Sequence, residues 1–205
     1  MNIEVKNSIK SVDYNKSIRF LENRVESVLS GKKNELLWIV EYPHVYTAGS
    51  NSNKLDLLDQ NINVINTKRG GKHTYHGPGQ KVVYFVLNLN KREKDIRKLI
   101  NKVENCIIKI LKEYKIKSSA DRNNIGIWIN KNNESKKIAA IGLRVKRWIA
   151  YHGFSLNVSC DLSMYKKIVP CGIKNKGVTS LKDQGVKKYA DINKIIIKNF
   201  LDTFL

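Results

Sequence analysis

KVVYFVLNL, residues 81–89, is an almost unbroken run of apolar, β-branched and aromatic side chains. A strand with one face in water alternates polar and apolar residues, whereas a continuous run indicates a strand that is covered on both faces. We therefore expect this segment to lie in the middle of a β-sheet.

The flanking sequence predicts further strands and three helices. Apolar residues recur at helical spacing after Asp13, a plausible N-cap, and Gly31 stands where that helix would stop. Other helices are expected over 96–114 and 191–204, and strands over 36–40, near 62–65, and over 125–129, 137–148 and 151–158. The last three strands follow one another closely and predict an antiparallel meander. No linker or repeat divides residues 1–205, so we expect one α/β domain with a mixed sheet.

Composition narrows the class of protein. Of the 205 residues 41% are hydrophobic, which is ample for a buried core. The chain has 38 Lys plus Arg and 18 Asp plus Glu, so its net charge is +20. This charge suggests nucleic acid or an acidic protein as partner. The alternative is compositional drift, because the basic residues are scattered along the sequence. The apolar runs are too short to span a membrane, and residues 1–10 lack the apolar region of a secretory signal. A soluble cytoplasmic protein is expected.

The three cysteines are Cys106, Cys160 and Cys171. Their spacing forms no close metal-binding pair, and an odd number argues against a disulfide framework. We expect no metal site, and any cysteine that matters should act as a thiol. Cys106 falls beside the apolar stripe of the helix expected over 96–114, which indicates a position in the core or on the flank of that helix.

RGGKHTYHGPGQ, residues 69–80, directly precedes the central strand and contains four glycines and a proline. We expect no regular element here. Glycine permits positive φ and close approach of the backbone to a ligand, so the polar side chains between the glycines should converge on a small space. The spacing matches neither the Walker nor the dinucleotide fingerprint. A ligand-binding loop is favoured over a long hairpin turn with incidental histidines.

Two further features carry potential chemistry. Pro170-Cys171-Gly172 presents a thiol on a constrained bend, but a free cysteine has a pKa of about 8.5 and needs a base or a cation to act as a nucleophile. Lys137 begins the run KIAAIGL, and in a regular strand Lys136 would point to the opposite face, so only one of the two lysines can face a cleft. A lysine in a cleft can lower the pKa of a nearby thiol or serve as a base.

Together these segments resemble the lipoyl(octanoyl) transferase family of the biotin/lipoate protein ligase superfamily. The resemblance extends over about residues 37–181 and keeps the family's order of motifs. It rests on RGG at 69–71, TYHGPGQ at 74–80, KIAAIGLR at 137–144, YHG at 151–153, LNV at 156–158 and PCG at 170–172.

The resemblance implies one α/β domain with a larger mixed sheet backed by helices and a smaller sheet. It implies octanoyl transfer from acyl carrier protein to a lysine of a lipoyl domain, in 2-oxoacid dehydrogenase complexes or the glycine cleavage H protein, with no nucleic acid or membrane as partner and a monomeric enzyme. No cofactor is implied, because the acyl group arrives on the carrier's phosphopantetheine arm.

The resemblance also implies roles for individual residues. Cys171 would be the nucleophile that becomes an acyl-thioester, and Lys137 would activate it. The substrate pocket would be lined by Arg69, Gly70, Gly71, Lys72, His73, Thr74, Tyr75, His76, Ala140, Ile141, Gly142, Gly153, Phe154 and Ser155. The Lys72-His73 pair departs from the commonest family pattern and affects the rim of that pocket.

The residues are chemically suited to this reaction. A thiolate at Cys171 can take the acyl chain by thioester exchange, and Lys137 can accept a proton from the thiol and later from the incoming amine. Backbone N–H groups near Gly77 or Gly142 are candidate oxyanion donors. The small residues Ala139, Ala140 and Gly142 leave room for an apolar chain.

Two alternatives remain open at this point. An ATP-dependent lipoate or biotin ligase of the same superfamily would form an acyl-adenylate and would not need the Pro-Cys-Gly thiol. A basic nucleic-acid-binding module would need exposed aromatic residues among its lysines, whereas the aromatic residues here fall in apolar segments. On the acyltransferase interpretation, the basic charge would speed encounter with acidic protein substrates.

Overall fold

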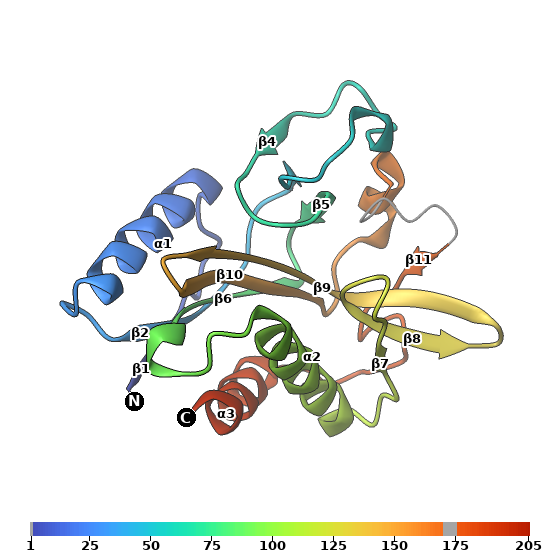
Figure 1. Ribbon diagram of the computed structural model, residues 1–205. Helices are drawn as coiled ribbons and strands as arrows, with labels where there is room; N and C mark the ends of the chain where they lie inside the picture. The colour runs from blue at the N-terminus through green and yellow to red at the C-terminus, as the bar shows by residue number, and fades with distance from the viewer. Residues whose placement is uncertain (1, 170–175) are drawn as a thin grey trace.

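The computed structural model describes residues 2–169 and 176–205, which form an eight-stranded and a three-stranded sheet (Figure 1). The strand order of the large sheet is β1-β2-β6-β10-β9-β8-β7, and β11 pairs with β9. Its strands are β1 Ile3–Asn7, β2 Glu35–Val40, β6 Gln80–Asn88, β7 Ser119–Ala120, β8 Ile127–Lys131, β9 Glu134–Lys146, β10 Ile149–Asn157 and β11 Gly177–Val178.

The continuous apolar run forms β6, which lies between β2 and β10 as the sequence predicted. Val83 and Phe85 belong to the core on one face of the sheet, and Val82 and Tyr84 to the core on the other. The strands β8, β9 and β10 form the predicted antiparallel meander. The pairs β1–β2 and β9–β11 are parallel, so the large sheet is mixed.

Helices cover both faces of this sheet (Figure 1). The helix α1, Tyr14–Leu29, lies on one face, and its N-terminus is capped by the Asp13 carboxylate, which accepts a hydrogen bond from the Lys16 N–H at 2.8 Å. The helices α2, Ile96–Glu113, and α3, Ile192–Phe204, lie on the other face and pack on each other. Cys106 of α2 is fully buried in that core, as predicted.

The small sheet corrects the expectation for the glycine-rich segment. Its strand order is β4-β3-β5, with β3 Val45–Ala48, β4 Val64–Asn66 and β5 His73–His76. The prediction that residues 69–80 form no regular element is therefore wrong for 73–76 and for Gln80, which begins β6. The glycines flank this tetrapeptide, so their flexibility serves the turns at its two ends and leaves four non-glycine residues free to pair with β3.

Other differences from the prediction are local. The strand expected near 62–65 is β4 and lies slightly later, and β1, β3, β7 and β11 were not predicted. A register shift between Ile127 and Trp128 pairs Ile127 with Ala139 and Trp128 with Lys137. Short 3-10 helices η1 Lys54–Asp56, η2 Leu89–Lys91 and η3 Leu162–Lys167 complete the described elements.

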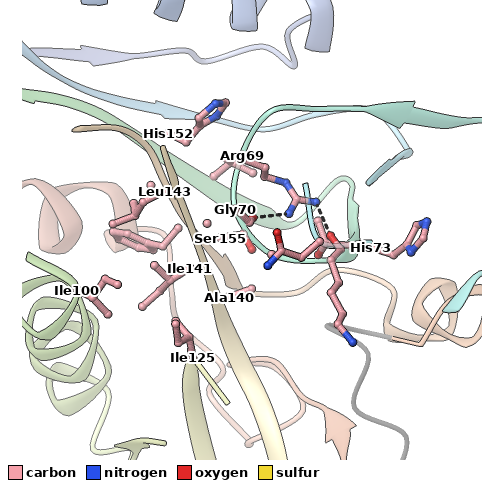
Figure 2. Close-up of a pocket in the computed structure, with 18 of the residues that line it drawn as sticks. Arg69, Gly70, His73, Ile100, Ile125, Ala140, Ile141, Leu143, His152 and Ser155 are labelled. Carbon is pink, nitrogen blue, oxygen red and sulfur yellow. Dashed lines mark hydrogen bonds between the residues drawn. The ribbon is translucent and has the colours of Figure 1, made fainter. Parts of the chain in front are cut away.

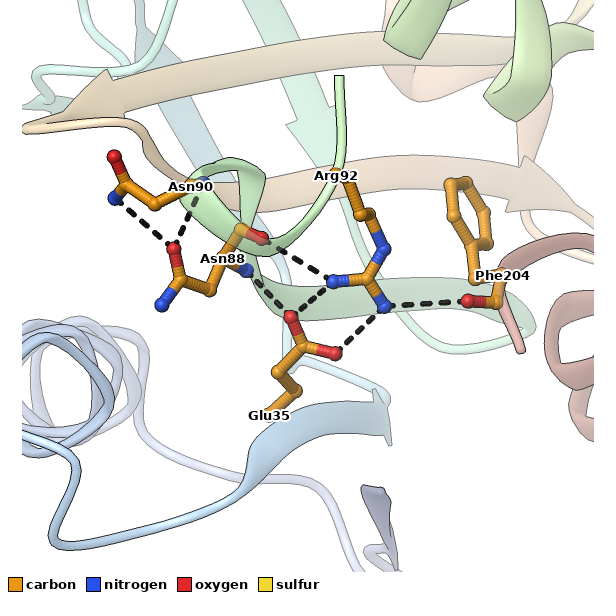
Figure 3. A network of polar contacts seen from close by, with 5 residues as sticks. All are labelled: Glu35, Asn88, Asn90, Arg92 and Phe204. Carbon is orange, nitrogen blue, oxygen red and sulfur yellow. Dashed lines mark hydrogen bonds and ion pairs between the residues drawn. The ribbon is translucent and has the colours of Figure 1, made fainter. Parts of the chain in front are cut away.

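A polar network ties the N-terminal strands to the C-terminal helix (Figure 3). The carboxylate of Glu35 forms a bidentate ion pair with the Arg92 guanidinium and accepts a hydrogen bond from the Asn88 N–H at 2.6 Å. Arg92 also donates to the Phe204 carbonyl at 3.2 Å. Both charged side chains are about nine-tenths buried, so this ion pair holds elements of the fold together and is not a surface contact.

Candidate functional site

A cavity of about 580 Å³ borders the segment of β9 that follows the residues paired with β8. Within the described residues, no strand pairs with this edge of β9 beyond Ala139. The Gly70 N–H donates a hydrogen bond to the Leu143 carbonyl at 3.0 Å, so the glycine-rich loop lies on the same edge. The edge of the strand and this loop therefore form the middle of the cavity.

The cavity has two unlike sides (Figure 2). Ile100 of α2, Ile125, Ile141 and Leu143 lie on one side and offer an apolar surface. Arg69, Gly70 and His73 lie on the other side, on the loop that leads into β5. An apolar surface facing a few polar groups is typical of sites that bind a largely hydrocarbon ligand.

Arg69 anchors the polar side. Its guanidinium donates to the Thr47 hydroxyl at 2.8 Å, to the Thr47 and Lys72 carbonyls at 3.1 and 3.0 Å, and to the Gly70 carbonyl at 3.1 Å. The side chain is buried, and a Cβ on Gly142 would approach its Cδ to 3.3 Å. Arg69 thus shapes the cavity wall by holding the loop in place.

The histidines of the cavity are neutral at physiological pH. Burial lowers the pKa of His76 to about 4, and its Nδ1 lies 2.6 Å from the Gln80 amide oxygen. Burial, helped by the charge of Arg69, lowers the pKa of His152 to about 3. His152 has φ +67, and its Nδ1 has no hydrogen-bond partner among the described residues. The pKa of His73 is also lowered, mainly by burial.

Lys137 places a second buried basic side chain in the site, after Arg69. It is 5% exposed, and its Nζ donates to the Ile125 carbonyl at 3.1 Å and lies 4.7 Å from the centre of the Trp128 ring. Lys136 is partly exposed and pairs with Glu134 at 2.9 Å. The prediction that only one of these lysines faces a cleft is confirmed.

The backbone around Lys137 is closely fitted. A Cβ on Gly126 would lie 2.8 Å from the Ala139 carbonyl oxygen and 3.1 Å from Lys137 Cε. The register shift of β9 brings Ala140 and Gly142 to the cavity with Lys137 and leaves Ala139 in the core. Of the three small residues expected to make room for a ligand, Ala140 and Gly142 line this cavity.

Asp121 connects the two segments beside Lys137. One carboxylate oxygen accepts hydrogen bonds from the Asn123 and Asn124 N–H groups at 2.9 and 3.2 Å, and the other pairs with Lys176 Nζ at 2.9 Å. Lys176 Nζ also lies 4.5 Å from the centre of the Trp128 ring. The loop that supplies the acceptor for Lys137 is therefore tied to the chain that follows the Pro-Cys-Gly motif.

Nearly all the residues predicted to bind substrate meet in this cavity. Tyr75 is the exception: it is fully buried, does not line the cavity, and its hydroxyl lies 2.7 Å from His44 Nδ1. Cys171 lies outside the described residues. The predicted residues that line the cavity are Arg69, Gly70, Gly71, Lys72, His73, Thr74, His76, Lys137, Ala140, Ile141, Gly142, Gly153, Phe154 and Ser155.

The two other cysteines are unsuited to nucleophilic chemistry. Cys106 and Cys160 are buried, and burial raises the pKa of each thiol to about 12. A thiol with so high a pKa carries almost no thiolate at neutral pH. Of the three cysteines, Cys171 is left as the candidate nucleophile.

Several lining residues were not predicted. His152 stands in the YHG motif, but the motif alone indicated no role for it. Tyr14, Val82, Tyr84, Ile96, Ile100, Asn123, Asn124 and Val145 also line the cavity and come from segments that periodicity assigns to ordinary helix, strand or loop. Only the packing of distant elements brings them together.

The described chain offers no sign of a metal centre or of a membrane-spanning helix. Within residues 2–169 and 176–205, no group of three or more His, Cys, Asp and Glu side chains is placed to hold a metal ion. No helix of the described chain combines the length and the hydrophobicity that crossing a bilayer requires.

Comparison with known proteins agrees with this picture. The sequence model of the lipoyl protein ligase A/B catalytic domain matches residues 13–201. An octanoyltransferase of Wolbachia sp. subsp. Brugia malayi (strain TRS) is 42% identical over 94% of this chain and 95% of its own. An octanoyltransferase of Ehrlichia canis (strain Jake) is 42% identical over 98% of this chain and 96% of its own.

Solved structures share the fold. A lipoate-protein ligase A bound with ATP superposes with a TM-score of 0.76 at 17% identity, over 99% of this chain and 85% of its own. A bipartite lipoate protein ligase from Thermoplasma acidophilum, studied with its E2 lipoyl domain, gives a TM-score of 0.72 at 14% identity, over 98% and 84%. The large mixed sheet, small sheet and helices predicted from the sequence are those of this fold.

Proposed function

The chain belongs to the lipoyl protein ligase A/B catalytic domain family, and we propose that it transfers an octanoyl group from acyl carrier protein to a lysine of a lipoyl domain. Its octanoyltransferase relatives make it an acyltransferase. The observation that carries the detailed proposal is Lys137, a buried ammonium on the wall of a largely apolar cavity.

Cys171 accepts the acyl group in the first half-reaction. Its thiolate attacks the thioester carbonyl of the octanoyl carrier, and the phosphopantetheine thiolate leaves and takes up a proton. In the second half-reaction the target lysine amine attacks the Cys171 thioester, an amide forms, and the cysteine thiolate is released. No cofactor takes part, since the acyl group arrives already activated as a thioester.

Lys137 acts as the general base in both half-reactions. Its ammonium group favours the thiolate of Cys171 electrostatically, and its amine form can take the proton from the thiol and later from the attacking lysine. The hydrogen bond to the Ile125 carbonyl holds Nζ at one place in the cavity. A base must lie within hydrogen-bond reach of the proton it removes, so a lysine amine held at one point suits this role.

The apolar side of the cavity suits the acyl chain. Ile100, Ile125, Ile141 and Leu143 offer a hydrocarbon surface without ionisable groups. Of the two candidate oxyanion donors, Gly142 lines the cavity and Gly77 does not. Gly142 is also paired with Gly153 of β10, so the assignment of the oxyanion donor stays a prediction. The acceptors are the lipoyl domains of 2-oxoacid dehydrogenase complexes and the glycine cleavage H protein.

We also propose that the enzyme is a monomer, as the resemblance to its family implies. We place its reaction in the cytoplasm, where the sequence predicts it.

Intact-mass spectrometry tests this proposal. With octanoyl carrier alone, the wild-type protein should gain one octanoyl group on Cys171, and Cys171→Ala should gain none. Lys137→Met should slow acylation strongly, whereas Lys136→Met, the matched control on the other face of β9, should acylate normally. An adduct that persists in Cys171→Ala would refute the role of the thiol.

The same protein preparations test the ligase alternative. A ligase would modify a lipoyl domain with free octanoate and ATP, and Cys171→Ala would retain that activity. The octanoyltransferase relatives favour the thioester route, and the ATP-bound neighbour shares only the fold.

A further inference from the structure

Two exposed leucines, Leu55 and Leu58, form an apolar patch on either side of Asp56, whose carboxylate pairs at 3.6 Å with Lys72 of the cavity lining. Leu55 is 81% exposed and lies in the middle of η1, and Leu58 is 60% exposed and lies two residues after η1 ends. Neither leucine lines the cavity. Two large aliphatic side chains held in water three residues apart cost free energy that a binding partner would recover.

The turn that carries the leucines is held in place by backbone hydrogen bonds. The Leu58 and Asp59 N–H groups donate to the Lys167 carbonyl at 3.0 and 3.1 Å, and the Val169 N–H donates to the Asp56 carbonyl at 2.7 Å. Val169 precedes Cys171 by two residues in the sequence. The leucines therefore sit on a fixed support next to the chain that leads into the Pro-Cys-Gly motif.

Lysines surround this patch. Lys54 adjoins Leu55, and Lys72 and Lys167 pair with Asp56 and Asp59 at 3.6 and 3.2 Å. Lys54 and Lys166 form no ion pair with any residue that the structure describes. Asp56 and Asp59 are each matched by one lysine, so Lys54 and Lys166 add unpaired positive charge beside the leucines, which suits an acidic partner with an exposed apolar side chain.

We propose that Leu55 and Leu58, with Lys54 and Lys166, form the docking surface for the acyl carrier protein. This inference rests on the proposed function, in which the carrier delivers the acyl group. A partner seated on the leucines lies beside the cavity and not over it. The phosphopantetheine arm can cross that gap, whereas the shorter side chain of an acceptor lysine requires its domain to sit at the mouth itself.

The test separates the carrier protein from its arm. Rates of Cys171 acylation are measured with octanoyl carrier and with octanoyl-CoA, which has the same pantetheine thioester without the protein. The double variant Leu55→Glu/Leu58→Glu should lose about tenfold or more of kcat/KM with the carrier and keep the wild-type rate with octanoyl-CoA. Ile9→Glu, at a side chain that is 98% exposed between β1 and α1, is the matched control and should change neither rate.

Charge is tested separately. Lys54→Glu/Lys166→Glu should lower kcat/KM for the carrier and flatten its dependence on salt, because rim charges act mainly on the association rate. Melting temperatures close to the wild-type value would show that both double variants are folded, as expected for exposed side chains.

The outcomes are distinct. Equal carrier rates in the wild type and the leucine variant would overturn the docking surface alone. So would a variant that acylates normally but transfers the group slowly to a lipoyl domain, since the patch would then serve the acceptor. A wild-type protein that octanoyl carrier cannot acylate would overturn the proposed function and the docking surface with it.

Discussion

Replacing Gly126 by alanine should displace Lys137 without replacing any ionisable residue. The added Cβ would lie 2.8 Å from the Ala139 carbonyl oxygen, which is backbone of β9, and 3.1 and 3.3 Å from Lys137 Cε and Cδ. The sheet holds the carbonyl, so the lysine side chain or the loop that carries Gly126 must move. The φ of +135 adds backbone strain of about 1–3 kcal/mol for a non-glycine residue.

We expect Gly126→Ala to lose about 2 kcal/mol of stability and, if Lys137 moves by about 1 Å, up to about 100-fold in the rate of Cys171 acylation. Urea denaturation gives the first quantity, and single-turnover acylation followed by intact mass gives the second. Gly185→Ala is the control, because Gly185 has φ +85 but nothing within 4 Å of the added Cβ. A folded Gly126→Ala variant that acylates at the wild-type rate would refute the reasoning.

Three further predictions concern the fold and the surroundings of the site. Glu35→Gln should destabilise the protein by about 3 kcal/mol in urea denaturation, because it leaves the buried Arg92 without its counter-charge, and acylation by the folded protein should be unchanged. His76 and His152 have pKa values of about 4 and 3, below the unfolded value of about 6.5. The contribution of each histidine to the free energy of unfolding is therefore complete above pH 6.5 and is lost as the pH falls towards the folded pKa, by about 1–2 kcal/mol at pH 5. Urea denaturation at pH 7 and pH 5 should show this loss of stability. His152→Asn should make the loss smaller. Asp121→Asn should lower the kcat of acylation about tenfold with little effect on the KM for the carrier, since it loosens the loop on which Lys137 depends; an altered KM at unchanged kcat would contradict this role.

The fold was predictable wherever one segment determines its own structure. The apolar run of β6 continues over at least eight residues, and the apolar residues of α1 and α2 keep helical spacing over at least two turns. In these segments the structure that the local sequence favours is also the one that packs in the fold. The strand β1 is different: only Ile3 of its five residues is buried, and it exists because β2 offers a parallel edge. The tetrapeptide β5 is likewise a strand because β3 is adjacent, a fact that composition does not contain.

The same distinction applies to the site. The alternation of a strand was enough to predict that Lys136 and Lys137 face opposite ways. It was not enough for Ala139 and Ala140, because the register shift opposite Trp128 changes which of them faces the cavity. Tyr75 belongs to the same motif as residues that line the cavity, but its side chain points away from the cavity and its hydroxyl contacts His44. Motifs thus identified the loop, whereas the contribution of each side chain depends on contacts with distant strands.

The division of β9 suits the proposed role of Lys137 as a base, because one strand carries both a fixed lysine and the edge of an open cavity. At Lys137 the strand is paired on both sides, with Trp128 of β8 and Val178 of β11, so the backbone that bears the lysine cannot shift sideways. From Ala140 onward β10 is its one strand partner among the described residues, and the other edge borders the cavity. The Gly70 N–H donates to the Leu143 carbonyl on that edge and so fixes the loop beside the cavity. A residue that must hold a proton at a defined point therefore belongs to the clamped half, and the residues that must admit an acyl chain belong to the open half.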